Sequence, residues 1–586
     1  MPTSDPSRLV ELRVLDGPNL YFTRPAIKLT LSAKEWMEAP DDRILEVAIR
    51  LRLRGAARAA ARPGGEPPAS ASARPGPPGS ERRLRFVIRL AGQLTRDLAR
   101  ATHTHLAVRA RAGSEPDQVI VAYPWRRRTA SEAFGRETAR LFDEVLRDPS
   151  SAESLVADAA RRLGAIEPGP GPSVAVPAIS VIAVTGTNGK TTTVRLLTHL
   201  IRTAGMTVAY SSTDGVYVNG EQAEPGDYSG FEGASKALSQ PGVEAAVLEV
   251  ARGGILLRGI GAMHNDVAVV TNVSSDHLGL HGIYTLDQLA EVKSTILRIT
   301  KTDGWDVLNA DDPRVLAMRR VARGRPFLFS RDPDHPALRS TLAERGRAIT
   351  VIDDALTVLE PGRDPRALLP LVDVPVTLAG ISGNNVQNAM AAAAAALGIG
   401  LPEEAVTAGL RTFVLDPETN PGRANLFELD DRIVVVDYAH NEAGIQGLVE
   451  ICQGLRRKGG EVWLSYSSAG DRTDEVIHGL GYIAARGAEH PVVCELQHYL
   501  RGRDRQDLVR RLVAGAEDGG ATNVPVFPDE IHALTWMLES STPNDVVAVT
   551  ALGQRREIFQ LMKERGAERV SPRRCRELVL EARGDS

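Results

Sequence analysis

Apolar runs of five or six residues, each followed by a glycine-rich or polar segment, recur along the chain from residue 179 onward. Runs rich in Val, Ile and Ala, typical of buried β-strands, cover residues 179–184, 245–250, 267–271, 434–438, 462–466 and 546–550. Apolar positions at helical spacing predict helices over residues 194–204, 286–299, 477–486 and 531–538. Strands that alternate with helices in this way predict α/β domains built on largely parallel sheets.

Toward the amino terminus the pattern is different. Residues 84–92 and 130–146 have the spacing of helices and residues 119–123 are typical of a strand, so we expect a small α+β domain. Residues 56–83 hold the run ARPGGEPPASASARPGPPGS, which has too few large apolar groups to offset the entropy of ordering. We predict a disordered insertion there, and an interdomain linker over the Pro- and Gly-rich residues 164–178.

The chain therefore divides into three predicted domains, an organisation compatible with its 586 residues. These are an N-terminal α+β domain (1–163), a central α/β domain (179–422) and a C-terminal Rossmann-like α/β domain (423–586). The composition, 43% hydrophobic and 25% charged, is that of a globular protein and excludes a wholly disordered or fibrous chain.

Composition also limits the expected location. The three cysteines, Cys452, Cys494 and Cys575, are too widely spaced to suggest a disulfide framework or a zinc site. The longest apolar run, Ala389 to Leu401, is too short to span a bilayer, and no charged-then-apolar leader opens the chain. We expect a cytoplasmic protein with neither a membrane nor a nucleic acid as partner.

Charge is unevenly distributed along the chain. The net charge is −4, but residues 1–178 carry 28 basic and 21 acidic residues, net +7, which leaves −11 for the rest. A basic N-terminal domain on an acidic body would attract an anionic substrate or polymer. An arginine-rich solvated surface explains the same numbers, and both interpretations stay open. Because the chain has 62 arginines and only eight lysines, each lysine is informative.

A phosphate-binding loop is predicted directly after the first strand of the central domain. Residues 185–193 read TGTNGKTTT and lie between that strand and a helical pattern, the setting that a phosphate loop requires. Gly186 and Gly189 allow backbone N–H groups to approach phosphate oxygens, and the helix N-terminus adds its dipole. Lys190 would hold the β- and γ-phosphates of ATP and Thr191 would reach Mg²⁺. The remaining candidate nucleotide-binding residues of the loop are Thr187, Asn188 and Thr192.

The loop TGTNGKTT resembles that of the Mur ligase superfamily. The segments DYSG (227–230), VLE with ARGGIL (247–256) and TNV with DHLG (271–279) are most similar to the Mur-type half of cyanophycin synthetases. Residues 14–19 (VLDGPN) are similar to the opening of those enzymes, with Asp16 at a position where the family has arginine. The family carries an ATP-grasp domain between these two parts, whereas this chain has only the short predicted linker.

The resemblance implies a metal site beside the phosphate loop. Glu249 ends a predicted strand, where open α/β sheets bind ligands, and it matches the family glutamate that binds Mg²⁺. His277 matches the histidine that holds a second Mg²⁺. Lys293 matches the family's carbamylated lysine; the residues alone, without the resemblance, favour a plain lysine on a helix surface. Lys190, His277 and Lys293 form the expected catalytic set.

The resemblance also implies the other contacts of the nucleotide. Asn385 and Asn388, near the start of an Ala-rich helix, match family residues that lie near adenine, although asparagines at a helix start are often caps. Arg423 and Asp437 match residues that reach the phosphates and the ribose from the C-terminal domain, and His440 fits a contact at the phosphate end.

The activity implied is that of an ATP-dependent carboxylate–amine ligase acting through an acyl phosphate. Its expected partners are a small-molecule acid or acidic peptide and an amino-acid donor such as arginine; homo-oligomerisation stays open. A folylpolyglutamate-type ligase, a cell-wall Mur ligase and a nucleotide-binding regulatory or scaffold protein with residual ATPase activity are the alternatives.

Overall fold

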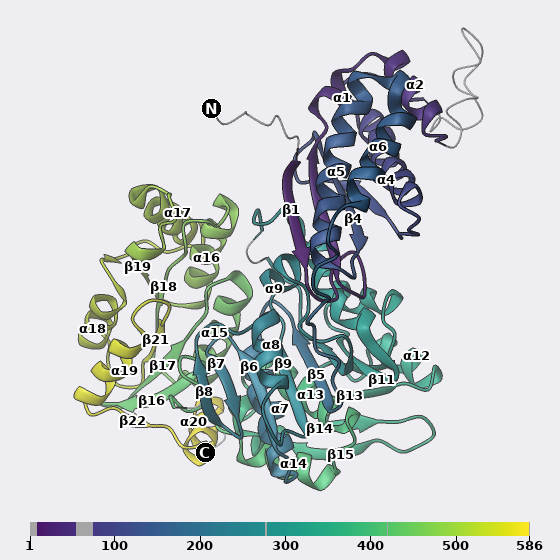
Figure 1. Ribbon diagram of the computed structural model, residues 1–586. Helices are drawn as coiled ribbons and strands as arrows, with labels where there is room; N and C mark the ends of the chain where they lie inside the picture. Colours follow the sequence, from purple (N-terminus) through teal and green to yellow (C-terminus); the bar gives the residue numbers. More distant parts are fainter. Residues whose placement is uncertain (1–8, 54–73, 276–277, 419, 585–586) are drawn as a thin grey trace.

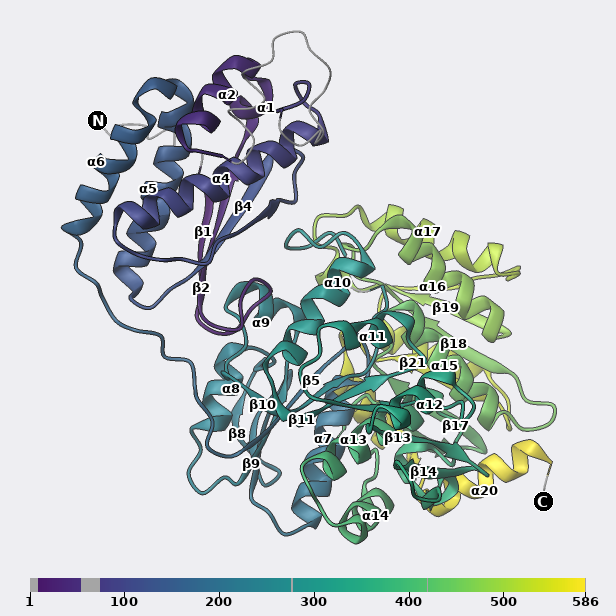
Figure 2. The same cartoon turned by 90° about the vertical axis from the view of Figure 1, so that its right-hand side faces the viewer.

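The computed structural model describes residues 9–53, 74–275, 278–418 and 420–584, and these residues form three sheets with their covering helices (Figure 1). The N-terminal sheet and its helices sit on the middle domain, and the C-terminal domain lies beside the middle one (Figures 1 and 2). Within the described residues, every helix is too short or too polar to cross a membrane.

The N-terminal domain is a four-stranded antiparallel sheet with helices on one face. Its strands, in spatial order, are β1 (Leu9–Leu15), β2 (Ala26–Ser32), β4 (Gln118–Pro124) and β3 (Arg109–Ala112). Its helices are α1 (Lys34–Glu38), α2 (Asp41–Arg50), α4 (Glu81–Ala101), α5 (Arg128–Arg147) and α6 (Ala152–Gly164). Because side chains alternate along a strand, Ile27, Leu29 and Leu31 of β2 pack against the helices while Lys28 and Thr30 face the other way.

The middle domain has an eleven-stranded sheet whose centre is parallel and whose two edges are antiparallel hairpins. In spatial order the strands are β15 (Arg366–Pro370), β14 (Ala355–Leu359), β13 (Arg347–Ile352), β12 (Arg325–Phe329), β11 (Thr300–Asn309), β10 (Asn265–Val270), β5 (Ser180–Thr185), β9 (Ala245–Glu249), β6 (Val208–Ser212), β7 (Gly215–Val218) and β8 (Glu221–Pro225). The helices are α7 (Lys190–Thr203), α8 (Phe231–Leu238), α9 (Arg252–Leu257), α10 (Leu286–Lys293), α11 (Pro313–Ala317), α12 (Pro336–Ala343), α13 (Gly383–Gly398) and α14 (Glu403–Thr412).

The C-terminal domain is a second α/β unit. Its seven strands lie in the order β20 (Val526–Phe527), β19 (His490–Cys494), β18 (Val462–Tyr466), β21 (Val546–Thr550), β17 (Arg432–Asp437), β16 (Asn425–Leu429) and β22 (Glu568–Arg569), parallel from β20 to β17. Its helices are α15 (Glu442–Leu455), α16 (Asp474–Gly487), α17 (Arg505–Asp518), α18 (Glu530–Ser540), α19 (Arg555–Glu564) and α20 (Pro572–Arg583). The predicted α/β fold class is confirmed.

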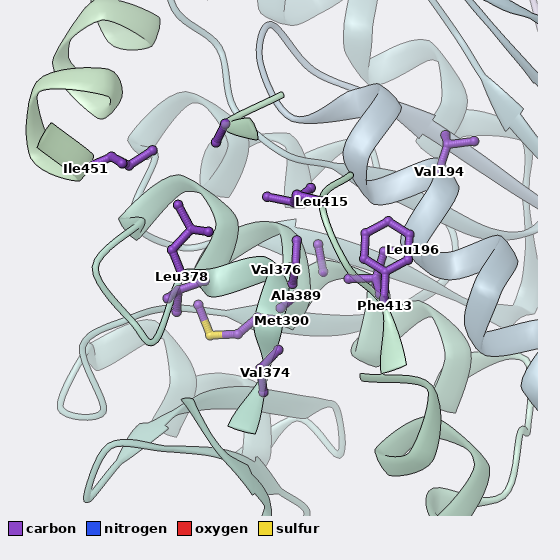
Figure 3. Close-up of a cluster of buried hydrophobic side chains, with 14 of the residues drawn as sticks. Val194, Leu196, Val374, Val376, Leu378, Ala389, Met390, Phe413, Leu415 and Ile451 are labelled. Atoms are coloured by element: carbon purple, nitrogen blue, oxygen red, sulfur yellow. The ribbon is translucent and has the colours of Figure 1, made fainter. Parts of the chain in front are cut away.

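One hydrophobic core joins the middle and C-terminal domains. It includes Val194 of α7, Met390 of α13, Phe413 of the segment that connects α14 to β16, and Ile451 of α15 (Figure 3). The alanines of α13 are buried throughout, and their small side chains let this helix lie close to α7 and to the sheet. The same apolar contacts therefore position the start of α7, where the phosphate loop ends, relative to the C-terminal domain.

Two predicted loop segments differ in detail from the structure. Residues 56–73 of the predicted insertion lie outside the described residues, but its last residues, 81–83, form the first turn of α4. Arg83 is fully buried there because its guanidinium pairs with Asp41 and donates to Gly76 O at 3.0 Å. Residues 165–179 form no helix and only one isolated bridge, Ala175 to Ala262, so the linker is extended yet attached to the middle domain.

Candidate functional site

The phosphate loop begins where the strand order of the middle sheet reverses. β5 lies between β9 and β10, both of which come later in the chain, so the crevice at its carboxyl end is flanked by the loops that follow those two strands. Ligands of open α/β sheets bind at such a switch point. Residues 186–189 leave β5 there, and α7 begins immediately afterwards at Lys190.

Both glycines of the loop are required by close contacts. Gly186 has φ 154°, and a Cβ at this residue would lie 1.8 Å from Thr271 Oγ1. Gly189 has φ 83°, and its Cβ would lie 2.1 Å from Asn388 Oδ1. Because neither contact leaves room for a side chain, the loop backbone lies directly against the segment after β10 and against α13.

The segment after β10 holds the loop in shape. Asn272 Oδ1 accepts from Asn188 N at 2.8 Å, and Thr271 Oγ1 donates to Asn188 O at 2.6 Å. Lys190 Nζ donates to Thr187 O at 2.8 Å, a hydrogen bond within the loop itself. The first N–H groups of α7 have no partner within the helix, which leaves them for an anion. Thr271 and Asn272 belong to the TNV motif, but nothing in the motif predicted this role.

Glu249 and Thr191 meet beside the loop. Thr191 Oγ1 donates to Glu249 Oε2 at 3.0 Å, while the buried Glu249 Oε1 has no hydrogen-bond partner among the described residues. Burial raises the pKa of Glu249, against the opposing effects of Lys190 and Thr191. Mg²⁺ is commonly held by one or two carboxylates together with phosphate oxygens and water. An orphaned carboxylate oxygen next to a threonine hydroxyl fits such an ion.

Lys293 lies at the same site but not in the long helix that was predicted. The prediction of one helix over residues 286–299 is wrong, because α10 ends at Lys293 and residues 294–299 form a 3₁₀-helix. The Lys293 side chain is buried, and its Nζ donates to Gly186 O at 2.6 Å. His277 lies outside the described residues. Within the described part of the chain, no three His, Cys, Asp or Glu side chains gather as a metal cluster.

Asn385 and Asn388 lie behind the phosphate loop, in the first two turns of α13. Asn388 Nδ2 donates to Asn385 Oδ1 at 3.0 Å, and Thr193 Oγ1 donates to Asn388 Oδ1 at 3.3 Å. The cap of α13 is Ser382, whose hydroxyl accepts from Asn385 N. Both asparagines are buried and neither lines the cleft described below, so their predicted place beside adenine stays a prediction.

The C-terminal domain lies across the site from the phosphate loop. The Arg423 guanidinium lies over the Tyr438 ring, 5.0 Å from its centroid, and His440 Nδ1 is 3.0 Å from Tyr438 O. Asp437 Oδ2 accepts from Ala424 N at 2.7 Å. Burial raises the pKa of Asp437 to about 6, with Arg423 opposing the shift. The three predicted residues Arg423, Asp437 and His440 therefore gather at the carboxyl end of β17.

These two walls enclose a cleft of about 810 Å³. The phosphate loop, Glu249 and Lys293 line it from the middle domain, and Arg423 and His440 line it from the C-terminal domain. Further lining residues were not predicted as site residues: Asp214, Arg501 and Arg555, together with Ser229 and Arg252, which lie in the motifs DYSG and ARGGIL but had no role assigned. Arg501 and Arg555 carried no recognisable signal, because arginine is the common cation of this chain.

A pair of asparagines joins the two domains at the cleft. Asn188 Nδ2 donates to Asn441 Oδ1 at 3.1 Å, and Asn441 Nδ2 donates to Asn188 Oδ1 at 2.9 Å. Asn441 is also the N-cap of α15, where its Oδ1 accepts from Gly444 N at 2.9 Å. The position of an asparagine just before a helical pattern was the available signal, but it indicates only a cap.

Models of known families match both halves of this site. Residues 184–396 match the Mur ligase middle domain, and residues 422–553 match the glutamate ligase domain of Mur ligases. The chain belongs to the Mur ligase family. The resemblance expected from the motifs is thereby confirmed, and the phosphate loop, Glu249 and Lys293 fall in the Mur ligase middle domain, with Arg423 and His440 in the glutamate ligase domain.

Curated relatives extend the comparison with Mur ligases. The chain is 39% identical over 373 residues to a cyanophycin synthetase of Synechocystis, a match that covers 63% of this chain and 42% of the relative. It is 29% identical over 386 residues to a UDP-N-acetylmuramyl-tripeptide synthetase of Deinococcus radiodurans, covering 64% of this chain and 73% of the relative. The chain thus spans less than half the length of the cyanophycin synthetases that it matches.

A solved structure supports the Mur ligase fold. A bifunctional folylpolyglutamate synthase/dihydrofolate synthase, with Mn, AMPPNP and L-glutamate bound, is 19% identical and superposes with a TM-score of 0.50, covering 66% of this chain and 90% of that chain. At this level of identity the likeness concerns the fold alone.

Proposed function

We propose that this chain is an ATP-dependent carboxylate–amine ligase that forms an amide bond through an acyl phosphate. The observation that carries the proposal is the orphaned Glu249 oxygen beside Thr191, at the mouth of a phosphate loop and inside a two-domain cleft. A buried carboxylate without a full set of partners is costly unless a cation or a donor completes it. Glu249 and Thr191 would hold Mg²⁺ as that cation when ATP is bound.

The residues of the cleft have distinct proposed roles. The backbone of residues 186–189 and the N-terminus of α7 bind the phosphates, Lys190 neutralises the transferring phosphoryl group, and Thr191 with Glu249 hold Mg²⁺. Mg²⁺ offsets phosphate charge when bound. Lys293, if carbamylated, and His277 would hold a second ion. Arg423, Asp437 and His440 contact the nucleotide from the C-terminal domain, and Asn385 with Asn388 lie on its adenine side.

The proposed reaction needs no covalent enzyme intermediate. A substrate carboxylate oxygen attacks the γ-phosphorus of ATP, the bond to the β,γ-bridging oxygen breaks, and ADP leaves. A substrate amine then attacks the acyl carbon, phosphate leaves with the acyl oxygen, and the amine proton is lost to water or base. The protein contributes positioning and electrostatic stabilisation, which are the main sources of catalysis in phosphoryl transfer.

For the substrates we propose an acidic amino acid or acidic peptide as acceptor and an amino acid as donor. The similarity to proteins named cyanophycin synthetases and the basic N-terminal part of the chain support this choice. Relatives named as cell-wall ligases and a structural neighbour named as a folylpolyglutamate synthase support the same type of ligation on other acids.

The test is a screen for ADP release with purified full-length chain, ATP and Mg²⁺, using pairs of candidate acids and amines, with mass detection of the product. We expect ADP release that requires both an acid and an amine and equals the amide formed. ATP hydrolysis that is independent of both would instead indicate a nucleotide-binding protein with residual ATPase activity. Lys190→Ala should lower turnover at least about 100-fold, because one such contact is worth about 3 kcal/mol. Lys236→Ala, at a surface lysine paired with Glu224, should leave turnover unchanged.

A further inference from the structure

The N-terminal sheet has a charged face directed toward the middle domain. In the register of the sheet, one row across the strands reads Glu11, Thr30, Ile120 and Arg111, and the next row reads Arg13, Lys28, Ala122 and Arg109. These positions alternate with the apolar ones that pack against the helices, so all eight side chains share the opposite face. One face of this sheet therefore carries four cations and a single carboxylate.

A cavity of about 600 Å³ lies between this face and the middle domain. Glu11, Arg13, Lys28, Thr30 and Arg111 line it from the sheet. Leu20, Ile120, Ile255 and Ile283 supply apolar lining, and Gln288 and Glu291 of α10 and His281 line it from the middle domain. It shares no lining residue with the nucleotide cleft. Helix α10 lies between the two spaces and contributes Gln288 and Glu291 to the cavity, and Leu289 and Lys293 to the cleft.

The charges around the cavity do not balance. Lys28 Nζ lies 2.9 Å from Glu11 Oε2, and Arg13 pairs with the other oxygen of the same carboxylate. Arg111 Nη1 lies 3.2 Å from Glu291 Oε2. Two cations thus share one half-buried carboxylate, and Arg111 depends on a single, more exposed one.

Two more arginines at this interface add to the excess. Arg109 lies over the Phe22 ring, and Arg298 donates to Leu20 O at 3.0 Å. Burial lowers the pKa of Arg298; Glu291 opposes this shift, and Arg109 and Arg111 add to it. Near the cavity these five cations therefore have two carboxylates, Glu11 and Glu291, since the Asp16 carboxylate of the same interface pairs with Arg258 instead. Like charges held together at partial burial are relieved by an anion.

Thr30 provides an independent observation. It is buried in the lining of the cavity, and its hydroxyl has no hydrogen-bond partner among the described residues. A buried hydroxyl without a partner is destabilising, and a ligand that hydrogen-bonds to it removes that cost. Its neighbours in the row are Glu11 and Ile120, so the hydroxyl stands between the charged and the apolar parts of the lining.

We propose that this cavity binds a small acidic ligand that carries carboxylates and an ammonium group, of the size of an acidic amino acid or dipeptide. Its carboxylates would lie against Arg111, Arg13 and Lys28, and Glu11 and Glu291 provide partners for the ammonium. The volume is in the range of small-molecule sites. The proposal does not rest on the ligase activity, because the cavity is separate from the nucleotide cleft.

Isothermal titration of the full-length chain at low salt tests the proposal, with L-aspartate and the dipeptide Asp-Asp as probes and L-arginine and inorganic phosphate as comparison ligands. We expect saturable binding of the acidic probes that weakens as salt is added, and much weaker binding of L-arginine and phosphate. The absence of saturable binding of either acidic probe, or binding of phosphate as tight as that of aspartate, would overturn the proposal.

Substitutions of the residues that line the cavity test whether the acidic probes bind there. Arg111→Gln and Lys28→Gln should each weaken binding of the acidic probe at least tenfold while an ATP analogue binds as before, which also shows that the fold is intact. Arg85→Gln, at an exposed arginine of α4, is the matched control and should bind like the unaltered chain. Lys190→Ala should retain the acidic probe. Loss of the probe in Lys190→Ala, or its unchanged affinity in both cavity variants, would place the binding elsewhere and contradict the proposal.

Discussion

The buried carboxylate of Glu249 combines an oxygen that has no partner with a raised pKa. Its Oε2 accepts from Thr191, its Oε1 has no partner among the described residues, and burial raises its pKa above the ordinary value of 4.5. The buried carboxylate therefore binds protons more readily than an exposed glutamate does. Since Mg²⁺ requires the ionised form, metal and proton compete for the same oxygens.

We predict that the affinity for Mg²⁺ depends on pH through Glu249. Below the raised pKa, each pH unit should weaken Mg²⁺ binding about tenfold, because one proton must be displaced, and the effect should extend to higher pH than 4.5. Titration of Mg²⁺ with an ATP analogue at several pH values measures this. Glu249→Gln should bind Mg²⁺ weakly with a flat profile, and Glu244→Gln, at an exposed glutamate, should behave like the unaltered chain. A flat profile in the unaltered chain would contradict the assignment.

Lys293 is the second residue whose chemistry follows from its place. It is buried beside Gly186 at the end of α10, in the cleft. Lys293→Arg should lower ATP turnover by about 100-fold, since a guanidinium forms no carbamate and its fixed charge repels Mg²⁺. Small carboxylic acids should restore part of the turnover of Lys293→Ala but none of Lys293→Arg. Lys301→Arg, at a lysine paired with Asp266, is the control. Near-normal turnover in Lys293→Arg would refute a carbamate ligand.

At the scale of elements, the start of α15 has two tasks. Asn441 caps the helix through Gly444 N and is paired with Asn188 of the phosphate loop. Serine also caps helices but is too short for the reciprocal amide pair. A serine variant therefore separates the capping of α15 from the contact between the two domains.

We predict that Asn441→Ser unfolds at nearly the same temperature as the unaltered chain but has a higher KM for ATP, because the C-terminal domain no longer holds the loop. Asn441→Ala should show the same rise in KM and also lose about 1 kcal/mol of stability. Thermal unfolding and ATP kinetics measure the two effects. Equal KM values in all three proteins would show that the asparagine pair has no role in nucleotide binding.

At the scale of the whole molecule, the arrangement of the domains limits how many amide bonds the chain can form in its product. Residues 165–179 connect the N-terminal domain directly to β5, and the phosphate loop occupies one cleft. One cleft activates one carboxylate at a time. We therefore predict one ATP consumed per amide and a product of discrete mass from this chain, measured by mass spectrometry with purified protein. A ladder of ever-longer chains built from free amino acids would contradict this prediction.

The pattern of the sequence determined those features that depend on neighbouring residues. Apolar runs placed β18 and β21 at the predicted residues, because a short buried strand is specified by its own side chains. The loop at residues 185–193 was recognisable because strand, glycines, lysine and helix follow one another directly. The length of the helix ending at Lys293 was mispredicted, because apolar spacing does not distinguish an α-turn from a 3₁₀-turn.

Only the tertiary structure decided which distant residues meet. Asn188 and Asn441 are 253 residues apart along the chain, and Thr191 and Glu249 are 58 apart, so no local pattern contains either pair. The charged face of the N-terminal sheet arises from the register of four strands, which brings Arg111 into the row of Glu11. Local sequence fixes backbone conformation over a few residues, whereas partners are chosen when whole elements pack, and the cleft and the cavity are both products of that packing.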